Sequence, residues 1–409
     1  MTYDLTDPNF LTDPTPMLAR MRAEGALVET KMPFLGKVYM TTTDAAARRV
    51  LKDQETFARN PVRAGGKSYD RIMWWLPGFM KPIMQNMLLH DGPEHKRLRG
   101  LVDKAFSRHA MLDMAPAIAA SADALLDQID PSRPTDIVSA YARPLPLLAI
   151  CDLLGIPDED RDKVRRWISP ISAPVGPFSM MFAMPGLYKI IRYFRAEFAA
   201  VRAGNGRPGL IRDLVEVEQD GDRLNEDELL GMVVTLFVAG HETTVHLISN
   251  AIVGSLDMPG LGQRLAQNPD QLPIAIEEFM RFMSPVLMTK PLFVVHDTEV
   301  DGMALNRGDK VAAFLLGANH DPQRVDRPDE FQSDRRPNPH LGFGHGPHVC
   351  LGMQLARTEA QVALERLFLR FPNLEFAVPR AEIQRSRRIG IRGYGAVPVY
   401  LEAPVQKAA

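Results

Sequence analysis

The sequence predicts a mainly α-helical protein with small β-sheets, because helical periodicity dominates the chain and strand-like segments are few and short. Helical spacing of apolar residues is found in residues 15–24, 44–52, 93–106, 115–129, 159–167, 187–202, 225–256 and 353–370. Alternating or β-branched runs predict strands at residues 38–42, 292–295 and 397–401, with more sheet near Ile389. The fold class is therefore helical with minor sheets.

The chain shows no sign of division into separate units. Its 409 residues are 45% hydrophobic, which is enough to bury a large core and a cofactor within it. No internal repeat, low-complexity tract or charge block is present, and Pro and Gly are scattered rather than gathered into a linker. We expect a single domain spanning residues 1–409.

Charge and cysteine content narrow the class of protein. Lys and Arg total 48 against 50 Asp and Glu, so the bulk charge gives no reason to expect nucleic-acid binding. Cys151 and Cys350 are too few for a disulfide framework and suit a reducing compartment. The N-terminus lacks a signal-peptide pattern, and the apolar run 229–240 is shorter than the roughly 20 residues of a spanning helix. We expect a cytoplasmic protein without a membrane span.

Two segments, 61–89 and 171–185, resist assignment to helix or strand. Both are rich in Met, Trp, Phe, Pro and Gly, which suits apolar loops that close over a site. The residues that would form such a flexible lid are Met73, Trp74, Trp75, Phe79, Met80, Met84, Met180, Met181 and Phe182. Ordinary core packing is the alternative for each of them.

The strongest signal is the loop FGHGPHVCLG, which runs from Phe343 to Gly352 and ends just before the helix predicted at 353. Gly344 and Gly346 permit turns that a Cβ would forbid, so that peptide N–H groups can point at the sulfur of Cys350. Those dipoles and the helix N-terminus favour a thiolate near neutral pH. An inert buried cysteine would not need these neighbours, and a zinc site would need more than one further cysteine.

Two further predicted helices carry polar residues that helix packing alone does not explain. In the helix from 225, Gly240 and Thr243 share one face and can form an oxygen-sized groove beside Ala239, while Glu242 adds a carboxylate directly after an apolar stretch. In the helix from 93, His95 and Arg99 share a face at i, i+4 spacing.

At these motifs the sequence resembles the cytochrome P-450 family over nearly the whole chain. The resemblance implies a prism-shaped single domain, haem b with Cys350 as axial iron ligand, and proton delivery to dioxygen by Glu242 and Thr243. It places His95 and Arg99 on haem propionates, and the other cofactor contacts at Ala239, Gly240, Phe343, Gly344, Gly346, His348 and Gly352. Leu236, Val286 and Ile391 match the family's substrate-pocket positions.

Other positions are expected to be structural or to depart from the family pattern. Glu278 and Arg281 resemble the family's structural ion pair, which Arg335 or His340 can extend. After Pro285 the family often has a propionate-binding arginine, but this chain has none there. Lys290 or His348 are the candidates to replace it.

The resemblance implies a haem-thiolate monooxygenase that hydroxylates an apolar small molecule. Two electrons would come from NAD(P)H through a ferredoxin and its reductase or a flavin-type donor. A basic patch of Arg97, Lys104 and Arg108 is a candidate docking surface for an acidic electron donor. The alternatives are a peroxide-driven oxygenase of the same architecture and a non-enzymatic haem protein that binds ligands.

Overall fold

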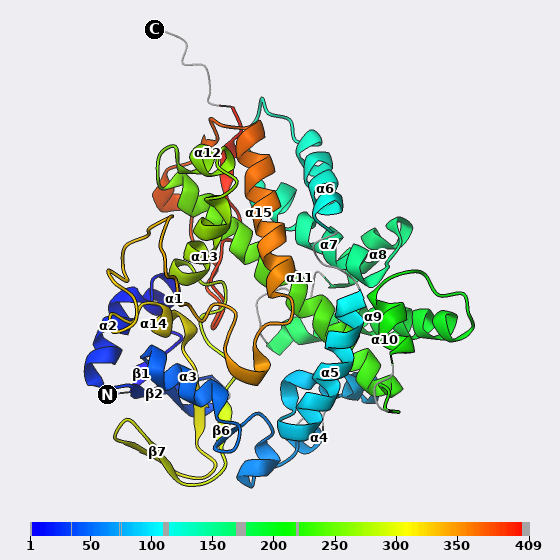
Figure 1. Ribbon diagram of the computed structural model, residues 1–409, viewed down its shortest axis with the longest axis vertical. Helices are drawn as coiled ribbons and strands as arrows, with labels where there is room; N and C mark the ends of the chain where they lie inside the picture. Colours follow the sequence, from blue (N-terminus) through cyan, green and yellow to red (C-terminus); the bar gives the residue numbers. More distant parts are fainter. Residues whose placement is uncertain are drawn as a thin grey trace.

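The computed structural model describes residues 2–33, 35–72, 74, 76–108, 114–168, 177–217 and 221–402. Helices fill most of the molecule, and strands from the first 60 residues and from residues 292–312 gather at one end with the N-terminus (Figure 1). The α-helices are α1 Pro8–Thr12, α2 Thr15–Glu24, α3 Asp44–Lys52, α4 Tyr69–Ile72, α5 Gly92–Arg108, α6 Ala115–Asp127, α7 Pro144–Leu154, α8 Asp158–Ile168, α9 Pro177–Arg202, α10 Leu210–Glu216, α11 Glu226–Leu256, α12 Leu261–Ala266, α13 Leu272–Phe282, α14 Leu315–Asn319 and α15 Met353–Arg370.

The strands form three small sheets. They are β1 Tyr3–Asp4, β2 Leu27–Met32, β3 Gly36–Thr41, β4 Phe57–Ala58, β5 Thr135–Asp136, β6 Leu292–Val294, β7 Thr298–Val300, β8 Met303–Leu305, β9 Lys310–Ala312, β10 Glu375–Phe376 and β11 Pro398–Tyr400. The largest has the order β1-β2-β3-β9-β6-β4, the second β10-β11-β5, and the third is the hairpin β7-β8. In the largest, β4 and β6 run antiparallel, with Ala58 opposite Phe293. The mainly helical prediction is therefore confirmed.

Helix α11 crosses the centre of the molecule and organises the core (Figure 1). A capping box starts it, because Asn225 and Glu228 bond reciprocally to each other's backbone N–H groups. It packs against α7, α13 and α15, and side chains on all of its faces are buried. By length and composition it could cross a membrane, but 61% of its apolar window is buried inside the protein, as in the core helix of a globular protein.

The two segments expected to be loops are largely helical where they are described. Residues 61–89 contain the 3₁₀ turns η1 Pro61–Ala64, η2 Gly78–Met84 and η3 Met87–Leu89, together with α4. Residues 177–185 begin α9, and residues 171–176 lie outside the described part. Short turns punctuated by Pro and Gly carry no long period, so the sequence pattern did not show them.

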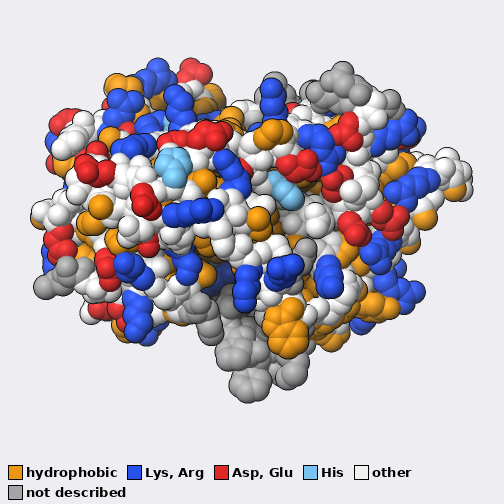
Figure 2. Space-filling view, turned by 90° about the horizontal axis from the view of Figure 1, so that it is seen from below, with side chains coloured by type: hydrophobic (Ala, Val, Ile, Leu, Met, Phe, Trp, Pro, Cys, Tyr) orange, Lys and Arg blue, Asp and Glu red, His pale blue; other side chains and the backbone are white. Residues whose placement is uncertain are grey.

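Basic and acidic side chains are interspersed on the face seen from below (Figure 2). This agrees with the nearly balanced total of 48 basic and 50 acidic residues.

Candidate active site

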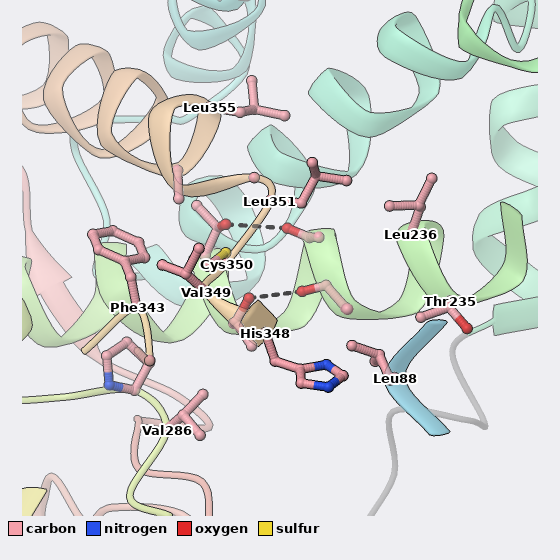
Figure 3. A pocket seen from close by; sticks show the side chains of 18 of the residues that line it. Leu88, Thr235, Leu236, Val286, Phe343, His348, Val349, Cys350, Leu351 and Leu355 are labelled. Carbon is pink, nitrogen blue, oxygen red and sulfur yellow. Dashed lines mark hydrogen bonds between the residues drawn. The ribbon is translucent and has the colours of Figure 1, made fainter. Parts of the chain in front are cut away.

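An apolar cavity lies between the middle of α11 and the loop that precedes α15 (Figure 3). The predicted site residues that line it are His95, Arg99, Leu236, Ala239, Gly240, Thr243, Val286, Phe343, Gly344, His348, Cys350 and Gly352. Glu242, Gly346 and Ile391 are outside its wall. The fold thus brings three distant segments of the chain, α5, α11 and the cysteine loop, around one space.

Local backbone geometry fixes Cys350 at this cavity. Gly344 and Gly346 have φ of 76° and 73°, a region that favours glycine. A Cβ on Gly346 would lie 2.6 Å from the carbonyl oxygen of Leu51 in α3, so the loop can pack there only with glycine. The N–H of Cys350 donates to the carbonyl of Phe343 at 2.9 Å, which closes the loop.

In the protein alone, the thiol of Cys350 holds its proton more strongly than an ordinary cysteine does. Burial raises the pKa of Cys350, although the backbone N–H of Gly352 and the charges of Arg99 and Arg357 act in the opposite direction. The expected effect of the dipoles is present, because the backbone N–H of Gly352 lowers the pKa of the thiol, but desolvation is the larger effect in the protein alone. A coordinated metal ion would deprotonate the thiol.

The wall opposite the cysteine loop is the stretch of α11 around Gly240. The hydroxyl of Thr243 donates to the carbonyl oxygen of Ala239 at 2.7 Å, and Thr244 donates to that of Gly240 at 3.1 Å (Figure 3). A Cβ on Gly240 would lie 3.3 Å from Ile150, so an added side chain would be crowded there. With Thr235, which also lines the cavity, three hydroxyl-bearing residues of α11 thus lie on a mainly apolar wall.

Glu242 points away from the cavity. Its carboxylate pairs with the guanidinium of Arg388, a residue 146 positions later in the chain. Both side chains are mostly buried, with exposed fractions of 17% and 16%. Glu242, the acid predicted beside the groove, is therefore held away from the cavity by Arg388. No local sequence pattern indicated this partner.

Nitrogen atoms without partners gather at one edge of the cavity. The rings of His95 and His348 lie 4.0 Å apart between centroids. Nε2 of His95 and both ring nitrogens of His348 are buried and have no hydrogen-bond partner among the described residues. Burial, followed by the charges of Arg59, His95 and Arg99, lowers the pKa of His348 to about 2. Arg99 donates to Asp103 and to the carbonyl of Val349.

Lys290 lies near this edge, although it does not line the cavity. Desolvation and then the charge of Arg59 lower the pKa of its ammonium group. Arg59 follows β4 directly and was not predicted as a site residue. Its signal is the pairing of β4 with β6, which brings residues far apart in the sequence together.

The predicted structural pair is the centre of a buried network. Glu278 and Arg281 are both fully buried and bond through two contacts of 2.8 Å. Arg335 donates to both oxygens of Glu278 at 3.1 Å, as anticipated. His340 instead contacts the neighbouring acid Glu277, at 3.0 Å.

The remaining predictions concern substrate and redox partner. Leu236 and Val286 line the cavity, and Ile391 is bridged to Val286 by backbone pairing. Of the lid residues, Met80 is buried and Trp74 is 79% exposed. Phe79 packs against the core, and Met84 lies in η2. The described part of the protein does not include Met73, Trp75 or the side chains of Met180, Met181 and Phe182. Met87 and Leu88, which were not predicted, line the cavity.

In the basic patch expected on α5, Arg97 is neutralised within the protein. Arg97 pairs with Glu94, Asp222 and Glu228, so its charge is compensated within the protein. The side chain of Arg108 lies outside the described residues. This reduces the case for an electron-donor docking surface on this face of α5.

The site fits a haem. An apolar cavity with one thiol in its floor suits the macrocycle and the axial ligand of its iron. The unpartnered nitrogens of His95 and His348 suit the two carboxylates, because buried polar atoms are otherwise almost always bonded.

Comparison with known proteins gives consistent results. Residues 187–384 match the family model "Cytochrome P450". The chain is 33% identical over 404 residues to vitamin D(3) 25-hydroxylase of Pseudonocardia autotrophica, covering 97% of this chain and 96% of that protein. Among solved structures, the cytochrome P450 PksS of Bacillus subtilis 168 superposes with a TM-score of 0.89 at 29% identity, covering 98% of this chain and 99% of that one. The myxobacterial CYP267B1 in complex with myristic acid gives 0.86 at 36% identity, with coverage of 97% and 98%.

Proposed function

Since the chain belongs to the cytochrome P450 family and is a monooxygenase, we propose that it hydroxylates an apolar small molecule with dioxygen and two electrons from a redox partner. The observation that carries this proposal is the position of Cys350, whose thiol faces an apolar cavity across from the hydroxyl-bearing wall of α11. We also assign the whole chain, residues 1–409, to one domain of a cytoplasmic protein.

When bound through the Cys350 thiolate, the haem iron supplies oxygen activation, because a thiolate ligand favours cleavage of the O–O bond. Phe343, Gly344 and Gly352 shape the floor around the sulfur, and Gly346 anchors the loop on α3. His95, Arg99 and His348 bind the haem carboxylates, since they supply hydrogen-bond donors where the cavity is otherwise apolar.

Thr243 and Glu242 have the chemistry to deliver protons. The hydroxyl of Thr243 lines the cavity and can donate to an oxygen there in place of the Ala239 carbonyl. Glu242, the residue before Thr243, lies on the side of the helix away from the cavity, where Arg388 pairs with its carboxylate. We assign Thr243 as the direct donor and Glu242 as the group that passes protons on from the solvent side.

The substrate is an apolar molecule. Leu88, Leu236, Ala239 and Val286 line the cavity, and no acid other than Glu359 appears in its wall among the described residues. One similar protein is named vitamin D(3) 25-hydroxylase and another was solved in complex with myristic acid, and both ligands are largely apolar. The electrons come from NAD(P)H through a ferredoxin or a flavin-type donor.

The optical spectrum of the reduced protein under carbon monoxide tests the proposal. We expect a strongly red-shifted Soret band in the wild type, since that shift reports thiolate ligation. Cys350→Ser should lose it, whereas Cys151→Ser should keep it, because Cys151 is buried in α7 and does not line the cavity. Absence of a haem spectrum after supplementation with haem would refute the proposal.

Oxygen accounting tests the proton donor. Thr243→Ala should still consume NAD(P)H with a redox partner but release hydrogen peroxide instead of hydroxylated product, because without this hydroxyl the two-electron-reduced dioxygen takes two protons from water and leaves before its O–O bond is cleaved. Thr243→Ser, which keeps a hydroxyl, should retain most of the coupling. Turnover with hydrogen peroxide alone, and none with electrons and dioxygen, would instead favour the peroxide-driven alternative.

A further inference from the structure

Arg59 is fixed by its backbone beside the haem-carboxylate edge of the cavity. The N–H groups of Arg59 and Asn60 donate to the two oxygens of Asp91 at 2.9 and 2.8 Å. On the other side, the hydroxyl of Tyr69 donates to the carbonyl oxygen of Arg59 at 2.9 Å. Because β4 pairs antiparallel with β6, the residue after β4 also lies close to the segment that contains Lys290.

The guanidinium of Arg59 has no partner in the described part of the protein. Its Nε is buried without a hydrogen bond, and the guanidinium forms no ion pair with a described carboxylate. The charge of Asp91 acts on Arg59, but its two oxygens accept the backbone N–H groups of Arg59 and Asn60 rather than the guanidinium. A half-buried guanidinium that makes no bond is costly, so its position calls for an anion.

Four side chains that are cations or hydrogen-bond donors lie at the same edge of the cavity. The charge of Arg59 acts on His95, His348 and Lys290, and in each case it opposes protonation together with desolvation. The ammonium of Lys290 likewise forms no hydrogen bond or ion pair among the described residues. These side chains come from four segments of the chain, and the acids nearby, Asp91 and Asp103, bond to other groups.

We propose that Arg59, with Lys290, binds one of the two haem carboxylates, while His95, Arg99 and His348 bind the other. The inference rests on the haem binding proposed above and adds a residue to it. It explains how the chain manages without an arginine after Pro285. A planar guanidinium binds a carboxylate through two parallel hydrogen bonds, which Lys290 alone cannot do. A carboxylate of the substrate is the other anion that the same groups could bind, and the experiment separates the two.

The test compares haem release from holoprotein variants carrying either haem or haem dimethyl ester, whose carboxylates are masked. Haem loss is followed as transfer to excess apomyoglobin. Arg59→Gln should release haem at least about tenfold faster than the wild type, because it loses the charge-assisted contact with the haem carboxylate. With the dimethyl ester, Arg59→Gln and the wild type should release the porphyrin at equal rates. Arg59→Lys should be intermediate with natural haem.

Arg71→Gln is the matched control, because it removes the same charge from an exposed position in α4. Its release rate should equal that of the wild type with both porphyrins, and circular dichroism verifies that each variant is folded. Equal rates for Arg59→Gln and Arg71→Gln, or the same acceleration with masked and natural haem, would overturn the inference. So would loss of fatty-acid binding by Arg59→Gln with unchanged haem release. Failure of the wild type to bind haem would overturn the proposed function itself.

Discussion

Glu278 and Arg281 are fully buried charges, and they stabilise the fold only if their hydrogen bonds are all formed. Arg281 contacts both oxygens of Glu278 and also donates to the carbonyls of Asn319 and Pro328. Arg281→Ala would leave the carboxylate buried with fewer partners, so we expect a loss of about 3–5 kcal/mol in the free energy of unfolding. Urea denaturation measures it.

The exposed pair of Arg212 and Glu216 on α10 is the control for that prediction. It has the same charges at i, i+4 spacing, but both side chains are almost half exposed. Arg212→Ala should cost roughly 0.5 kcal/mol or less. A similar loss for Arg281→Ala would mean that the buried network contributes no more than a surface ion pair.

Residues whose role depends on neighbours in the sequence could be predicted, and those defined by distant contacts could not. Cys350, with Gly344 and Gly346 at fixed offsets, is visible in the sequence because one loop makes the whole arrangement. Arg59 reaches the same edge through the pairing of β4 with β6, and Glu242 finds its partner 146 residues away. No periodicity within one segment reports either contact.

At the scale of elements, the packing of the cysteine loop on α3 determines how precisely Cys350 is placed. Both loop glycines have positive φ, but an added Cβ would meet Leu51 at 2.6 Å from Gly346 and only His348, at 3.7 Å, from Gly344. Gly344→Ala should therefore cost roughly 1 kcal/mol from backbone strain alone. Gly346→Ala should cost clearly more, because the loop must also move away from α3.

Thermal unfolding of the two alanine variants, together with their carbon monoxide spectra, checks this. We expect Gly346→Ala to have the lower melting temperature and a reduced yield of thiolate-ligated haem. Equal melting temperatures would show that the contact with α3 relaxes without cost.

Helices with an amphipathic period or a clear end signal could be predicted. α2, α3 and α15 have the predicted bounds, because α3 presents an apolar stripe on one face, α2 ends at Gly25 and α15 begins after Gly352. α7 was missed, since it is apolar on nearly every side and buried throughout, which leaves no period to detect. The two- and three-residue strands β1, β4 and β5 are too short to show alternation.

At the scale of the whole molecule, the buried histidines of α11 make stability depend on pH. Desolvation lowers the pKa of His241 and His246 to about 4, and for His246 the nearby charges of Arg388 and Arg143 add to the effect. The ordinary value is 6.5, so the unfolded chain binds protons that the folded protein excludes between pH 6.5 and 4. Stability is therefore complete above pH 6.5 and falls as the pH is lowered.

His246 provides the direct test, because neither of its ring nitrogens has a partner among the described residues and a neutral apolar side chain should replace it. Between pH 7.5 and 5 the wild type should lose about 2 kcal/mol for each such histidine. His246→Leu should lose about that much less over the same range, whereas His296→Leu, at an exposed position, should follow the wild type. Urea titrations at the two pH values measure the difference. If His246→Leu and the wild type lost equal stability, the histidine would be protonated equally in the folded and unfolded chains, and the acid sensitivity would have to arise from other groups.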